Sequence, residues 1–279
     1  AEFPGMSKLL RTETKSFDTL MPLIDLKDMV EFKSVAMGDV RKGDECILGL
    51  DVGSTTTKAV LLRLEDDAIL ASIYLRTDGD PVGASRKCYD SILGQISEKV
   101  NLDEISITGL GVTGSGRQIA GLHALTQGVI NEIIAHATAA VYFDSKVDTI
   151  FEIGGQDSKY ISLEKGRVVD FEMNKVCAAG TGSFLEEQAE KLGLDIREFG
   201  PLAIGATTPC GLGERCTVFM ESDVFSQQAD GASVEDIVAG LSYSIVRNYL
   251  HRVVGEKKIG NRIFFQGGTA FNTGVVAAF

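Results

Sequence analysis

Residues 46–62 read CILGLDVGSTTTKAVLL, and this stretch carries the most specific fold signal in the chain. An apolar run ends at Asp51, a turn of Gly, Ser and Thr follows, and a second run rich in Thr and Val begins. The pattern is typical of two strands joined by a tight turn. Because backbone N–H groups and hydroxyls of such a turn converge on one point, it suits a polyphosphate. We predict a phosphate-binding hairpin whose contacts are Gly53, Ser54, Thr55, Thr56 and Lys58.

The same pattern returns in the second half of the chain. Residues 149–163 read TIFEIGGQDSKYISL, with an acid at Glu152 and a lysine at Lys159. The acid and the lysine are seven residues apart in both copies. Each copy then continues through a charged turn into a third strand, which indicates a duplicated domain. We therefore predict an α/β protein with two lobes around a nucleotide cleft, in which Gly154 and Gly155 are further phosphate contacts.

The remaining patterns divide the chain into three parts. We expect an N-terminal extension or linker over residues 1–45, with a short helix around 24–33, a first lobe over 46–145 and a second lobe over 146–279. In the first lobe, apolar spacing predicts strands over 68–76 and 106–110, helices over 84–100 and from 116, and a buried helix over 131–143.

The second lobe carries two helix-start signals. Ser183 and Glu186 form a capping-box pattern for a helix that ends near Gly193, and Ser233 begins a long amphipathic helix through about 254. We also expect a third strand over 167–172, a strand over 262–266 and a last helix from about 271.

Composition excludes several classes of protein. The formal net charge of -12 argues against a nucleic-acid surface, which needs clustered Lys and Arg. No apolar run approaches the roughly 20 residues of a membrane helix, and the first residues show no secretory signal. We expect a cytoplasmic globular protein that binds neither nucleic acid nor membrane. Its five cysteines form no dense framework, which indicates reduced thiols or metal ligands.

The chemistry of the two turns assigns roles to their polar residues. Asp51 follows a strand and is placed to hold a hydrated Mg²⁺ ion, while Asp157 approaches from the facing lobe. We expect Asp51, Gln156 and Asp157 to position the metal and an attacking water. Two alternatives remain: Lys58 as a solvated edge residue, and Asp51 as a carboxylate that only caps the turn.

Two further glycine-rich stretches differ in what they predict. Gly267 and Gly268 follow a strand and precede a helix. We predict that an adenosine lies against this backbone, with Asn272 nearby. The alternative is that the glycine pair only forms a turn. Residues 109–114 match the dinucleotide fingerprint GxGxxG, but the acid expected after it, Glu132, lies in a helical stretch. We predict no dinucleotide site there.

Together, the two hairpins and the Gly267-Gly268 pair resemble the phosphate-1, phosphate-2 and adenosine motifs of the superfamily of acetate and sugar kinases, heat-shock chaperones and actin. The resemblance implies a duplicated ribonuclease H-like fold that binds ATP or ADP with Mg²⁺.

Two cysteine segments sharpen this resemblance. Residues 174–186 read NKVCAAGTGSFLE and residues 214–223 read ERCTVFMESD, and both are similar to the ATP-dependent activators of 2-hydroxyacyl-CoA dehydratases and to benzoyl-CoA reductase ATPase subunits. In that family each subunit gives two cysteines to a [4Fe-4S] cluster shared by a homodimer, and the matching positions are Cys177 and Cys216. Gly180, Thr181 and Gly182 follow closely enough to sense the nucleotide phosphates.

The alternative for both cysteines is burial as small apolar side chains. A zinc site that adds Cys210 lacks a fourth nearby ligand, because His136 and His251 lie in apolar helical contexts that favour packing.

The resemblance implies an ATPase coupled to electron transfer. A reduced ferredoxin or flavodoxin would supply the electron, and a dehydratase or reductase protein would accept it. A small-molecule kinase is the alternative, but it needs a carboxylate base aimed at a substrate hydroxyl, and the sequence names none. A nucleotide-switched scaffold is a third possibility. Residues 211–216, GLGERC, resemble large multidomain activases, so we expect this chain to be one module of a longer protein.

Overall fold

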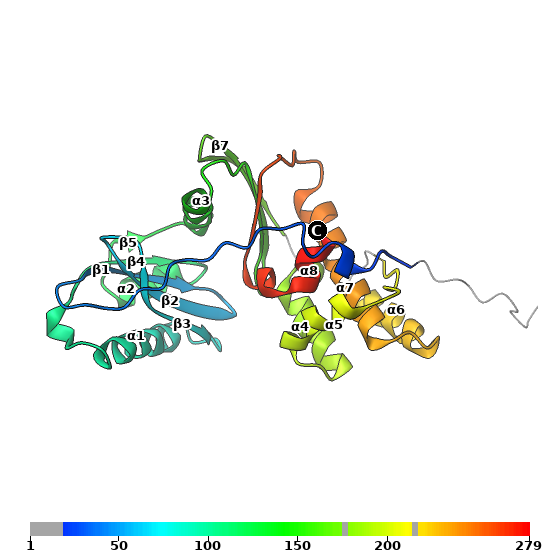
Figure 1. Cartoon of the computed structure of the whole chain (residues 1–279), viewed down its shortest axis with the longest axis horizontal. Coiled ribbons are helices and arrows are strands. Elements are labelled where there is room, and N and C mark those ends of the chain that lie inside the picture. The colour runs from blue at the N-terminus through cyan, green and yellow to red at the C-terminus, as the bar shows by residue number, and fades with distance from the viewer. Residues whose placement is uncertain (1–18, 175–177, 214–216) are drawn as a thin grey trace, which may run out of the picture.

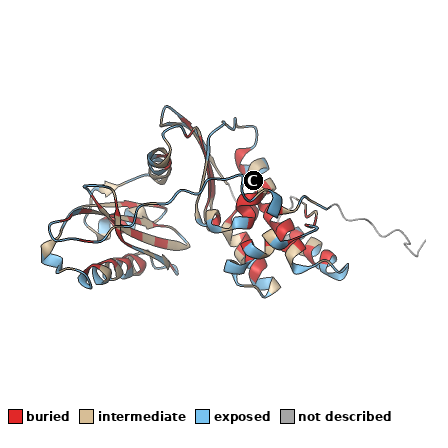
Figure 2. Ribbon diagram, in the orientation of Figure 1, coloured by how far each residue is buried: buried red, intermediate tan, exposed pale blue. Residues whose placement is uncertain are grey.

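The computed structural model describes residues 19–174, 178–213 and 217–279. Two β-sheets lie in two separate lobes, joined by the helix α3 (Glu132–Phe143) and by an N-terminal segment that runs along both (Figure 1). Red buried stripes follow the strands and the helix faces that cover them (Figure 2). Within the described ranges, none of the helices combines the length and the apolar character that a bilayer crossing demands.

The first lobe is built on a five-stranded sheet in the order β3-β2-β1-β4-β5. The strands are β1 (Glu45–Val52), β2 (Thr56–Arg63), β3 (Ile69–Arg76), β4 (Ser106–Thr113) and β5 (Gly128–Val129). The first three pair antiparallel, and β4 lies parallel to β1. Helices α1 (Pro81–Ser97) and α2 (Arg117–His123) pack on this sheet, and α1 starts at Asp80, whose carboxylate accepts the N–H of Gly83.

The second sheet repeats that arrangement with four strands in the order β8-β7-β6-β9. The strands are β6 (Thr149–Ile153), β7 (Ser158–Glu164), β8 (Arg167–Met173) and β9 (Ile263–Gln266). Again three strands pair antiparallel, and a later strand joins the first in parallel. This shared topology confirms the predicted α/β class and the repeated triple-strand unit.

Helices fill the rest of the second lobe. They are α4 (Gly182–Leu192), α5 (Ile196–Gly205), α6 (Thr217–Ala229), α7 (Val234–Tyr249) and α8 (Thr273–Ala278). The hydroxyl of Ser233 accepts the N–H of Asp236, which confirms the predicted start of α7, and a π-helical turn continues it to Val254. Gly193 ends α4 in the left-handed conformation, as predicted. The predicted capping box of that helix is wrong, because Thr181 is the N-cap and its side chain caps no N–H.

The helix predicted as buried is only partly so. Ile133, Ala137 and Ala140 form the buried stripe of α3, whereas Ile134 and Tyr142 are half exposed or more. Figure 1 shows α3 between the lobes and apart from the other helices. Because α3 links the two lobes, too few helices and strands surround it to cover its apolar residues on all sides.

The segment before β1 packs on both lobes. Leu23, in the 3₁₀ turn Leu23–Asp25, is fully buried in the second-lobe core, and no longer helix follows it over the predicted 24–33. The chain then crosses to the first lobe, where Ile69 exchanges backbone hydrogen bonds with Ala36 and Gly38. Val40 enters the first-lobe core.

We predict that Leu23→Ala lowers the free energy of unfolding by about 2–4 kcal/mol, because a fully buried leucine loses its packing and leaves a cavity. Urea unfolding measures the loss. Met29→Ala, at an exposed position of the same segment, is the matched control and should change stability little. Equal effects of the two substitutions would contradict the anchoring of this segment.

Candidate nucleotide site between the two lobes

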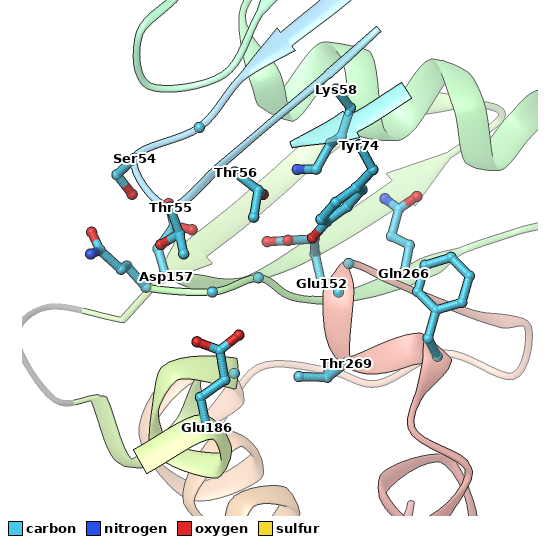
Figure 3. Close-up of a pocket in the computed structure, with 18 of the residues that line it drawn as sticks. Ser54, Thr55, Thr56, Lys58, Tyr74, Glu152, Asp157, Glu186, Gln266 and Thr269 are labelled. Atoms are coloured by element: carbon cyan, nitrogen blue, oxygen red, sulfur yellow. The ribbon is translucent and has the colours of Figure 1, made fainter. Parts of the chain in front are cut away.

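A cleft of about 830 Å³ lies between the two lobes, and both predicted hairpins line it (Figure 3). Every predicted hairpin contact lies in this lining: Gly53, Ser54, Thr55, Thr56 and Lys58 from the first lobe, and Gly154 and Gly155 from the second. Asp51, Gln156 and Asp157 line it as well. The structure therefore brings residues about 100 positions apart to one cavity.

The first hairpin is closed by a backbone bond and an ion pair. The N–H of Gly53 donates to the carbonyl of Thr56 at 3.0 Å, and a side chain at Gly53 would lie 2.9 Å from that oxygen. Asp51 and Lys58 are cross-strand neighbours, and the Lys58 ammonium donates to the Asp51 carboxylate at 3.0 Å. Both side chains are about a third exposed, so the pair remains open to the cleft.

The equivalent pair of the second hairpin is buried. Lys159 donates to Glu152 at 3.0 Å, and their side chains are 3% and 5% exposed. Lys159 also lies 3.1 Å from Asp157 and 3.6 Å from Glu132, which reaches over from α3. One ammonium thus faces three carboxylates, and the cluster carries excess negative charge.

This cluster shifts the pKa values of its members. Burial raises the pKa of Glu152 to about 7, although the ammonium of Lys159 opposes the shift. Burial disfavours the charge on Lys159, but the three carboxylates outweigh it and raise the pKa of that ammonium. His136, on α3, lines the same cleft, and burial followed by the charge of Lys159 lowers its pKa to about 4. At neutral pH the imidazole is therefore uncharged.

The turns of the two hairpins come close together at Thr55 and Gly155. A side chain on Gly155 would lie 3.0 Å from the hydroxyl of Thr55, so glycine permits this approach. Within the described ranges, the buried Thr55 hydroxyl has no hydrogen-bond partner. The open carboxylate of Asp51 lines the same cleft, and a carboxylate suits a hard cation.

Helix α4 begins directly on the second hairpin. The N–H groups of Gly182 and Ser183 donate to the carbonyls of Gly154 and Gly155 at 2.8 and 2.7 Å. Gly182 lines the cleft, but Thr181 is fully buried and Gly180 packs on the backbone of Tyr249, outside the lining. Of this predicted triplet, only Gly182 reaches the cavity.

The predicted adenosine segment lies at the other end of the cleft. Gly267 has φ of 98°, and a side chain there would meet the carbonyl of Ile153 at 2.4 Å, so this position requires glycine. Gly268 and Asn272 line the cavity, and the Asn272 amide oxygen caps α8 through the N–H groups of Gly274 and Val275.

Sequence reasoning missed several lining residues: Tyr74, Arg76, Glu186, Arg197 and Phe271. Phe271 is 88% exposed beside the Gly pair and offers an aromatic face. Arg197 belongs to α5, and the reciprocal cap of Asp195 and Glu198 is the sequence signal for the start of this helix.

Comparison with known proteins agrees with this geometry. Residues 48–279 match the BadF/BadG/BcrA/BcrD ATPase family. The chain belongs to this family. The 2-hydroxyisocaproyl-CoA dehydratase activator of Clostridioides difficile is 35% identical over 234 residues, which are 83% of this chain and 84% of that protein. The (R)-2-hydroxyglutaryl-CoA dehydratase activating ATPase of Acidaminococcus fermentans is 32% identical over 234 residues, 83% of this chain and 85% of that one.

A solved structure is similar as well. The activator of the 2-hydroxyisocaproyl-CoA dehydratase, determined with bound ADPNP, superimposes with a TM-score of 0.75 at 32% identity and covers 84% of each chain. The resemblance to the dehydratase activators and the two-lobed ribonuclease H-like fold are thereby confirmed.

The cysteines of the second lobe differ in whether the structure describes them. Cys177 and Cys216 lie outside the described residues. Cys210 is described and buried, and burial followed by the charge of Asp236 raises the pKa of its thiol to about 11. It packs in the second-lobe core as a small apolar side chain. Among the residues with described positions, no group of three or more His, Cys, Asp and Glu side chains could hold a metal ion.

We predict that the buried cluster gives stability two opposing pH slopes. Between pH 4.5 and 7 the folded Glu152 binds more protons than the unfolded chain, so its contribution falls as pH rises. Between pH 4 and 6.5 the folded His136 binds fewer protons, so its contribution grows. Each full slope is about 1.4 kcal/mol per pH unit.

Urea unfolding from pH 4.5 to 6.5 measures both slopes. Glu152→Gln removes the falling contribution, so the free energy of unfolding should rise more steeply with pH than in the unsubstituted protein. His136→Gln removes the rising contribution, so the slope of the free energy of unfolding against pH should become more negative. Parallel profiles for all three proteins would show that neither group titrates as its surroundings indicate.

Proposed function

We propose that this protein is an ATP-hydrolysing activator that couples closure of its cleft to electron transfer. One observation carries the proposal: two hairpins of the same design, each with an acid opposite a lysine, face each other across one cavity. Paired turns of this kind present N–H groups to a polyphosphate from both sides. The solved relative with bound ADPNP supports a nucleotide in this cleft.

The lining residues suit distinct parts of a magnesium nucleotide. Asp51, open to the cleft, would hold hydrated Mg²⁺, which neutralises phosphate charge when bound. Gln156 and Asp157, at the second turn, would orient the attacking water. The turn residues of both hairpins would bind the phosphates, and the Gly267-Gly268 backbone beside Phe271 would take the adenosine.

The redox half of the proposal rests on the family. Two relatives act on dehydratases by name, which supports a dehydratase-like or reductase-like acceptor for this chain too. Cys177 and Cys216 of two protomers would hold a [4Fe-4S] cluster, which supplies a low-potential electron when reduced by ferredoxin or flavodoxin. The described chain adds a link: α4, which starts five residues after Cys177, is hydrogen bonded to the second hairpin.

We predict that Asp51→Asn lowers kcat for phosphate release at least about a hundredfold, because the metal-holding charge is lost. The assay follows inorganic phosphate with ATP, Mg²⁺ and no added acceptor. Asp103→Asn, an exposed carboxylate of the same lobe, is the control and should behave as the unsubstituted protein. Phosphate transfer only to an added hydroxyl compound would instead favour a kinase.

We predict a broad iron–sulfur absorption band in anaerobically purified protein. Cys177→Ala and Cys216→Ala should each abolish it, whereas Cys210→Ala should retain it, because the Cys210 side chain is buried in the second-lobe core. A protein that stays colourless after reconstitution with iron and sulfide would remove the redox half and leave the ATPase half standing.

A further inference from the structure

An ion pair spans the mouth of the cleft. Arg76, the last residue of β3 in the first lobe, donates to both carboxylate oxygens of Glu186 on α4 in the second lobe, at 3.2 and 2.9 Å. Figure 3 shows Glu186 pointing from its helix toward the hairpins. Both residues line the candidate nucleotide site. The pair is bidentate, so it fixes the relative orientation of the two groups as well as their distance.

On the first-lobe side, the contact continues into the phosphate hairpin. Thr77 follows Arg76 and is buried. Its hydroxyl donates to the carbonyl of Gly53 at 2.8 Å, and its N–H donates to the carbonyl of Thr55 at 2.9 Å. A displacement of the first hairpin therefore moves the backbone that carries Arg76.

On the second-lobe side, the contact continues into the other hairpin. Glu186 lies in the first half of α4, whose first N–H groups, those of Gly182 and Ser183, bind the carbonyls of Gly154 and Gly155. A closed ring of contacts results, from the first hairpin through Thr77, Arg76 and α4 to the second hairpin. Both hairpins, Arg76 and α4 contribute residues to the lining of the cavity.

We propose that Arg76 and Glu186 form an interlobe latch, a pair of positioning residues that holds the two phosphate hairpins and α4 in the closed arrangement. This inference rests on the proposed nucleotide function and adds to it the contact through which the first lobe acts on α4. Arg76 and Glu186 are about half and two-fifths exposed, so water competes for them and the latch is weak. A weak contact suits a closure that must reverse in each cycle.

The neighbouring residue supplies a matched control. Glu187 has similar exposure on the same helix, but its carboxylate pairs with Lys191, one turn further along α4. That pair does not cross the cleft. Glu187→Gln removes the same charge from the same helix and leaves the latch intact.

Amide hydrogen exchange tests the latch. The reporters are the amides of Thr77, Gly182 and Ser183, measured in nucleotide-free protein for Arg76→Gln, Glu186→Gln, their double variant and the charge exchange Arg76→Glu with Glu186→Arg. We expect each single variant to exchange about two- to fivefold faster, the double variant no faster than either, and the charge exchange to recover most of the loss. Glu187→Gln should match the unsubstituted protein.

Additive effects in the double variant, or equal exchange in all proteins, would overturn the latch. Arg76→Lys keeps the charge but not the bidentate geometry, so partial recovery by this variant guards against a general folding defect.

A second arm separates the latch from the nucleotide function. In the unsubstituted protein, ADPNP should protect the hairpin amides, and the KM for ATP should rise equally in Arg76→Gln and Glu186→Gln. Absence of protection in the unsubstituted protein would count against nucleotide binding, while the nucleotide-free comparison still judges the latch. If ADPNP protected the hairpin amides equally in all variants and the KM for ATP were also equal, the result would count against the latch and not against nucleotide binding.

Discussion

In each lobe, a carboxylate and an ammonium face each other across the two strands of the phosphate hairpin. The geometry of the cleft depends on this contact. Asp51 pairs with Lys58 and Glu152 with Lys159 at the same register position, just before the turn. A slip of one residue would send each partner to the opposite face of its sheet. The pairs therefore support the register that turns both glycine-rich loops toward the same cavity.

The two pairs have diverged in their surroundings, although their sequence spacing is the same. The first is partly open, so its carboxylate can exchange a lysine contact for a hydrated cation. The second is closed over by α3, and Glu132 adds a third carboxylate around its lysine. Desolvation makes such a cluster costly to rearrange. The open hairpin is thus suited to change with the ligand, and the buried one to hold its geometry.

Much of this architecture follows from local sequence pattern, since Gly turns between apolar runs specify both hairpins and the repeat specifies the second sheet. Other features have no local signal. Arg76 and Glu186 are 110 residues apart and meet through the arrangement of the two lobes around the cleft. The apolar composition of α3 predicted burial, but burial depends on neighbours that a linking helix lacks. The sequence analysis did not predict α5, although its reciprocal cap of Asp195 and Glu198 is a local signal.

The lobes are joined on several sides, and these connections constrain how they can move. The N-terminal segment is anchored by Leu23 in one core and Val40 in the other. Between the anchors, residues 27–35 are largely exposed and form no regular helix or strand, so they can extend to at most roughly 30 Å. Because α3 and this segment join the lobes covalently, they limit how far the lobes can separate. The proposed latch between Arg76 and Glu186 adds a non-covalent contact to these covalent connections, so it is the link between the lobes that can break and form again.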